Sequence, residues 1–108
     1  MDLLMELNKK IKQLDYSIKQ LKISGKDYAK AYTDYRIALA KELLVLKNEG
    51  YAITLAGDIA RGKQEIAQLK FKEISTEAIY KANLESINAI KLEIKIIQEQ
   101  LNKEYNNE

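Results

Sequence analysis

The 108-residue sequence contains no cysteine, histidine, proline or tryptophan. Without cysteine and histidine, the chain lacks the usual zinc ligands, a thiol nucleophile and an imidazole base. The absence of cysteine also excludes a disulfide framework, which suits a reducing compartment. No glycine-rich phosphate loop, nucleophile elbow or metal-ligand spacing is present. We therefore expect no catalytic residue, no metal ion, no cofactor and no enzymatic activity.

Long hydrophobic runs are also absent. No stretch approaches the roughly 18 apolar residues that cross a bilayer, and no apolar segment of signal-peptide length follows Met1 and Asp2. We expect a protein of the cytoplasm with no membrane partner. The net charge of +2 is too small to indicate a polyanion partner on its own.

Apolar residues alternate at spacings of three and four through the first half of the chain. They are Leu4, Leu7, Ile11, Leu14, Ile18, Leu21, Gly25, Tyr28, Tyr32, Tyr35, Leu39, Leu43 and Leu46. This pattern predicts a long helix, over about residues 2–48, that packs against other helices. Asp2 is the expected N-cap and Gly50 the expected C-terminal glycine. Ser24-Gly25 is the weak point, where a bend or a break stays open.

Two further helices are expected. Thr54 predicts the N-cap of a short helix over about 54–61, which Gly62 would close. The last segment, about 63–104, has no glycine or proline and carries apolar residues at helical spacing. Its pattern is interrupted where Glu73, Thr76 and Asn83 occupy positions that the repeat would make apolar.

The expected fold is all-α. Two long helices with a short connection fold back antiparallel as a coiled-coil-like hairpin in a single domain, 1–108. Facing residue numbers then sum to about 108, which pairs Tyr28 with Tyr80 and Gly25 with Asn83. The expected core of the hairpin, or of a dimer of hairpins, is Leu7, Ile11, Leu14, Ile18, Leu21, Tyr28, Tyr32, Tyr80, Ile87 and Ile94.

Apolar residues on more than one face indicate self-association. Residues 37–46 are apolar on several sides, and Leu55 and Ile59 of the short helix can cover only one of them. Leu92 and Ile96 lie off the main stripe of the last helix. We expect a homodimer that forms a helical bundle, and parallel and antiparallel arrangements both stay open.

Lysines mark one candidate binding face. Lys12, Lys19 and Lys26 are seven residues apart, and Lys30 continues their side of the helix. Such a stripe could bind nucleic acid phosphates or an acidic protein, although a solvated coiled-coil flank has the same composition. The tyrosines at 28, 32 and 35 likewise fit either a base-stacking row or a wide helical seam.

The fold-back is the second candidate, because loop tips on rigid scaffolds often carry function. Residues 50–63 match a helix-turn-helix poorly, since Asp58 stands where that motif needs a small residue. A tip that engages a protein partner is the alternative. The residues expected to make that contact are Tyr51, Asp58, Arg61 and Lys63.

Residues 35–39, 50–54, 58–62 and 80–88 carry a resemblance that covers most of 28–105. In these blocks the chain resembles small uncharacterised helical proteins encoded by tailed phages and prophages of low-GC Gram-positive bacteria. The resemblance implies an early phage protein that modulates a host or phage machine, and it transfers no functional residue.

Two hypotheses follow. The first is a non-enzymatic, phage-encoded interaction protein that binds and modulates a larger host or phage protein, with a bacterial defence nuclease such as a CRISPR effector as one candidate target. The alternative is an accessory nucleic-acid-binding protein of phage recombination or replication that uses the lysine face.

Overall fold

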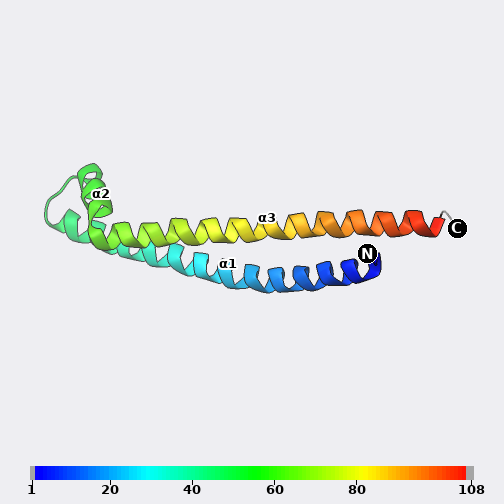
Figure 1. The fold of residues 1–108 in the computed structure, drawn as a ribbon. Helices are drawn as coiled ribbons and strands as arrows, with labels where there is room; N and C mark the ends of the chain where they lie inside the picture. Colours follow the sequence, from blue (N-terminus) through cyan, green and yellow to red (C-terminus); the bar gives the residue numbers. More distant parts are fainter. Residues whose placement is uncertain (1, 107–108) are drawn as a thin grey trace. The chain divides into compact units, whose positions relative to one another are not determined.

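The computed structural model describes residues 2–106 and contains three helices (Figure 1). They are α1 (Leu3–Asn48), α2 (Ile53–Gly62) and α3 (Gln64–Asn106). The described residues form no strand. The long helix α1 packs against the long helix α3, and α2 lies between them in the chain. The predicted all-α helical hairpin is therefore confirmed.

Hydrogen bonds account for both ends of α1. The Leu4 amide donates to Asp2 Oδ1 at 2.9 Å, so Asp2 caps the helix as expected. At the other end Gly50 has a φ of 97°. Its amide donates to the Lys47 carbonyl at 3.0 Å, and the Tyr51 amide donates to the Leu46 carbonyl at 3.2 Å. This pair of bonds is a Schellman motif, in which glycine adopts the left-handed conformation at low cost.

The ends of α2 differ from the prediction. Thr54 is not the N-cap, because α2 begins at Ile53 after an extended Ala52 that makes no side-chain cap. Gly62 does not close the helix either, since it is the last helical residue. The extended Lys63, with φ −68° and ψ 138°, ends α2 instead. The Lys63 carbonyl also accepts the Ala67 amide of α3 at 2.9 Å, so one residue serves both helices and no left-handed glycine is needed.

The chain forms two compact units. The terminal unit joins the residues up to Ser24 with those from Tyr80 onwards, and the tip unit is Gly25–Ile79. In the terminal unit Ile87, Ile90 and Ile97 of α3 are buried. Contacts of Lys10 with Glu93 and of Ser24 with Asn83 show that the two helices run antiparallel there.

The tip unit contains the main apolar cluster. Its buried members are Tyr35, Leu39, Leu46, Ala56, Ala60 and Ile66. Ala56 and Ala60 are the smallest members, and they allow α2 to approach α1 and α3 closely. Ile59 packs against this cluster as expected. The expected cover by Leu55 is wrong, because its side chain is 50% exposed.

The buried face of α1 is narrower than its apolar stripe. In the tip unit Ala31 is 1% exposed, whereas the adjacent Tyr32 is 45% exposed. In the terminal unit Ser24 is buried, whereas Ile11 is 41% exposed. Small side chains therefore occupy positions in the seam and allow close helix contact. Ile11 and Tyr32, expected in the core, lie beside the seam of the single chain.

The other expected core residues lie closer to the seam. Ile87 is buried, and the remaining members are partly buried; these are Leu7, Leu14, Ile18, Leu21, Tyr28, Tyr80 and Ile94. The helix α1 continues through Ser24 and Gly25. The break at this point that the sequence left open does not occur.

Hydrogen bonds satisfy the polar residues that interrupt the pattern of α3. Glu73 is buried and accepts a bond from Lys70 Nζ at 2.9 Å. The Thr76 hydroxyl donates to the Lys72 carbonyl at 2.8 Å. Asn83 Nδ2 donates to Ser24 Oγ at 2.8 Å. Each polar group thus has the partner that burial requires.

Candidate interaction surfaces

An apolar groove lies between α1 and α2 in the tip unit. It has a volume of about 460 Å³ and is lined by Ala40, Leu43, Leu44, Lys47, Ile53 and Ala56. We call it the tip groove. Among the described residues that line it, Lys47 alone is charged. Leu44 is 62% exposed and Ile53 is 77% exposed, and contiguous exposed apolar surface of this kind marks interaction sites.

None of the four tip residues singled out in the sequence is among the residues that line this groove. Tyr51 is exposed in the connection between α1 and α2, and Asp58 and Arg61 are exposed on α2. Lys63 forms an ion pair with Glu42. The hydrogen bond to Glu42 raises the pKa of the Lys63 ammonium. The ion pair therefore links α1 to the residue that immediately precedes α3.

Sequence reasoning missed Leu44 and Ile53 as surface residues. The signal was present, because residues 37–46 are apolar on more sides than two partner helices can cover. Leu55 was expected to cover residues 37–46, but it is half exposed. The small residues Ala56 and Ala60 meet the core in its place, which leaves the apolar face of α1 open beside Ile53.

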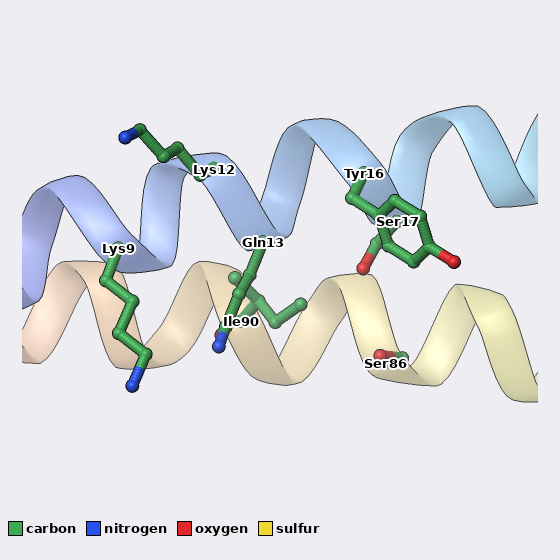
Figure 2. A pocket seen from close by; sticks show the side chains of 7 residues that line it. All are labelled: Lys9, Lys12, Gln13, Tyr16, Ser17, Ser86 and Ile90. Atoms are coloured by element: carbon green, nitrogen blue, oxygen red, sulfur yellow. The ribbon is translucent and has the colours of Figure 1, made fainter.

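A second groove, of about 590 Å³, lies between α1 and α3 in the terminal unit (Figure 2). It is lined by Lys9, Lys12, Gln13, Tyr16, Ser17, Ser86 and Ile90, and we call it the lysine groove. Figure 2 shows Lys9 and Gln13 extending from α1 toward α3, whereas Lys12 points away from α3. None of the described residues that line the lysine groove carries a carboxylate, so its local charge is positive.

The four lysines of the predicted face are exposed, but one of them already forms an ion pair within α1. Lys12 and Lys19 are exposed in the terminal unit, and Lys26 and Lys30 are exposed in the tip unit. Lys30 Nζ lies 2.8 Å from Asp34 Oδ2 one turn along α1. The bond to Asp34 raises the pKa of Lys30. One of the four lysines is therefore already neutralised by its own helix.

Two of the three tyrosines at 28, 32 and 35 make contacts with α3. Tyr35 is buried, and Lys70 Nζ lies 4.8 Å from the centre of its ring. The rings of Tyr28 and Tyr32 meet edge to face at 6.4 Å. The Tyr28 hydroxyl donates to Glu77 Oε2 at 2.5 Å. The pKa of Tyr28 is raised to about 12, mainly by this hydrogen bond and to a smaller extent by burial of the hydroxyl.

Residues 2–106 contain no group of three or more acidic side chains placed to hold a metal ion. Across the same residues, none of the helices combines the length and hydropathy of a membrane span. Comparison with protein-family models, curated proteins and solved structures gives no match.

Proposed function

We propose that this protein is a non-enzymatic interaction protein that binds a larger protein through the tip groove. The observation that carries the proposal is the exposure of Leu44 and Ile53 on either side of an apolar groove. Fully burying each side chain would contribute about 1.5–3 kcal/mol. A few such anchors on a rigid support are enough for a specific complex.

The support is rigid for reasons that lie in the chain itself. The Schellman motif fixes the turn after α1, and Ala56 and Ala60 fix α2 against the core. Little conformational entropy is therefore lost when a partner binds, which favours affinity. Tyr51, Asp58 and Arg61 are exposed in the same unit, and polar groups at the edge of an interface contribute to specificity more than to affinity.

We propose a phage origin and a modulating role from the resemblance to small phage proteins. Under this proposal the partner belongs to the host or the phage, and a defence nuclease such as a CRISPR effector is a candidate target. The protein would act in the host cell cytoplasm by covering a surface of its partner.

Affinity capture from phage-infected or defence-positive cells tests the proposal. The tagged protein is compared with a double variant, Leu44→Asp with Ile53→Asp, and with a control variant, Leu92→Asp with Ile96→Asp. The control makes the same chemical change at exposed apolar residues of the terminal unit. A partner retained by the parent and the control but lost by the tip variant supports the proposal.

The recovered partner is then purified and titrated with all three proteins by calorimetry. We expect the tip variant to bind at least about 100-fold more weakly, as loss of two buried anchors implies. Circular dichroism must show equal helix content in all three proteins. Equal binding by the tip variant, or recovery of this chain alone, would refute the proposal.

A second candidate function, accessory nucleic-acid binding, rests on the lysine groove. Lys9 and Lys12 supply cations, Tyr16 is 64% exposed, and no carboxylate opposes them. Bases of single-stranded nucleic acid stack on exposed aromatic rings while lysines bind their phosphates. The geometry therefore favours single strands over duplex.

Binding to fluorescent single- and double-stranded oligonucleotides at two salt concentrations tests this candidate. The key variant is Lys9→Glu with Lys12→Glu, which reverses both cations of the lysine groove. Its control, Lys91→Glu with Lys95→Glu, makes the same change of net charge on α3. Affinity that falls steeply with salt and is lost only in the key variant would support nucleic-acid binding. Equal loss in both variants would indicate non-specific attraction.

A further inference from the structure

Cations accompany the tip groove along its α1 wall. Arg36 lies one turn before Ala40 on the same face of α1, and Lys47 is the last α1 residue of the lining. Both side chains are exposed, and neither forms an ion pair with another residue of the part that the structure describes. Lys41, three residues before Leu44, is exposed as well. The α1 wall of the tip groove therefore carries three exposed cations.

The nearby acidic residues do not balance these charges. Between the first and the last of the three cations the only acidic residue is Glu42, and it is already paired with Lys63. Glu42 and, more weakly, Glu49 raise the pKa of Lys63, so both acids act on that lysine. On α2, Asp58 lies two residues after Ala56 and so on the opposite side of the helix from the groove lining. The surface beside the groove is therefore positive.

The lining of the groove favours a helical occupant. It is apolar apart from Lys47, and both walls are helices, which bond most of their backbone groups internally. An extended segment placed here would remove its own backbone N–H and C=O groups from water without gaining partners, which is costly. A helix satisfies these groups itself and presents only side chains, as amphipathic helices do in other apolar grooves.

We propose that the partner enters the tip groove as an acidic amphipathic helix. This inference rests on the proposed function of the tip groove and names the chemistry of its occupant. Arg36 and Lys47 are eleven residues apart and therefore about 16 Å apart along α1. A partner helix aligned with α1 places carboxylates about three turns apart against these two cations. The apolar residues between its carboxylates then meet Leu44 and Ile53.

An anionic membrane has a charge that suits the same cations, but the shape of the site favours a protein. The tip groove is a hollow of about 460 Å³ between two helices. A helix that binds a bilayer inserts its projecting apolar face, and a flat membrane surface leaves a hollow unfilled. A helix of a partner protein fills the hollow and buries both of its walls.

Selection from a displayed library of helical peptides about four turns long, followed by fluorescence anisotropy with synthetic peptides, tests this inference. We expect the parent protein to select peptides with apolar residues between acidic ones. Such a peptide should bind Arg36→Glu with Lys47→Glu at least about tenfold more weakly than the parent. The control, Lys91→Glu with Lys95→Glu, makes the same charge change at exposed residues of the terminal unit and should stay within about threefold. Replacing the peptide's acids by lysine should reverse the preference between parent and charge-reversed protein.

The groove variant, Leu44→Asp with Ile53→Asp, separates the possible failures. Peptides that lose affinity for it but bind the charge-reversed protein as tightly as the parent would overturn the acidic helix and leave the proposed function standing. Peptides that bind the groove variant normally, or a library that yields none, would count against both. Vesicles containing phosphatidylserine that bind the parent but not the groove variant would assign the groove to a membrane instead. A parent dimer that the groove variant dissociates would assign it to a second copy, and either result would overturn the inference. Circular dichroism must show equal helix content in every protein.

Discussion

Asn83 of α3 donates a hydrogen bond from Nδ2 to the Ser24 hydroxyl of α1 at 2.8 Å, across 59 residues of sequence. Ser24 is buried, and its hydroxyl in turn donates to the Leu21 carbonyl at 3.1 Å. The pair lies in a seam otherwise formed by apolar residues such as Ile87 and Ile90. A buried polar pair in a helical seam favours one register, because any shift leaves its members unpaired.

This relationship predicts coupling between the two side chains. Asn83→Ala should lower the free energy of unfolding by about 1 kcal/mol, and Ser24→Ala by a similar amount. The double variant should cost less than the sum, by about 0.5–1.5 kcal/mol. Urea unfolding followed by circular dichroism measures all three. Ser75→Ala is the control, because Ser75 bonds only to the Phe71 carbonyl of its own helix; additive losses at Ser24 and Asn83 would contradict the coupling.

The bond from Tyr28 to Glu77 predicts a loss of stability at alkaline pH. It raises the pKa of Tyr28 from 10.0 to about 12, so the folded state favours the protonated phenol. The bond therefore contributes its full stability at pH values below 10.0, the pKa of the tyrosine in the unfolded chain. This contribution is lost as the pH rises from 10.0 to about 12.

Tyr28→Phe removes that titration, and the variant should therefore lose less stability than the parent across the same interval. Urea unfolding at several pH values gives the two slopes, and the ultraviolet absorbance of the phenolate reports ionisation directly. Tyr16→Phe changes an exposed tyrosine of the same helix and serves as the control. Identical slopes for the parent and Tyr28→Phe would count against the role of this bond.

Three glycines of the tip unit, Gly50, Gly57 and Gly62, should respond to alanine in opposite directions. Gly50 has a φ of 97°, which strains any residue with a Cβ atom. Gly50→Ala should therefore lower the free energy of unfolding by about 1–2 kcal/mol. Gly57 and Gly62 are helical. A Cβ at Gly57 would meet only the flexible end of Arg61, at 2.8 Å, and one at Gly62 would meet nothing within 4 Å.

Alanine at Gly57 or Gly62 should consequently stabilise the protein by about 0.5–1 kcal/mol, through the gain in helix propensity. Thermal unfolding followed by circular dichroism ranks the three variants. If Gly50→Ala were as stable as Gly62→Ala, the left-handed turn after α1 would not matter to the fold.

The sequence was enough to predict the helices but not which face of each is buried. The sequence predicted both ends of α1 to within one residue, because Asp2 and Gly50 are local signals for the start and the end of a helix. It could not choose between Ala31 and Tyr32, since both lie beside Tyr28 and Tyr35 on the helix. The choice depends on how closely α3 approaches, which is a property of the packed pair. The same limit applied to the tip groove, where Ala56 rather than Leu55 meets the core.

Glu73 is the least expected residue of the seam, and its removal should stabilise the hairpin. Its side chain is 10% exposed and accepts a bond from Lys70, whose own side chain is 47% exposed. Burying a carboxylate costs free energy that a single exposed partner offsets only in part. Glu73→Leu should therefore raise the free energy of unfolding by about 1 kcal/mol.

Lys70→Ala should have the opposite effect, because it leaves the buried carboxylate without its partner. Urea unfolding of both variants tests the pair, and Glu85→Leu, the same change at an exposed position of α3, should stay within about 0.5 kcal/mol of the parent. If Glu73→Leu were less stable than the parent, the carboxylate would be contributing net stability. If it were more stable but unfolded with reduced cooperativity, Glu73 would act in the seam as Asn83 does, by disfavouring other registers at a cost in stability.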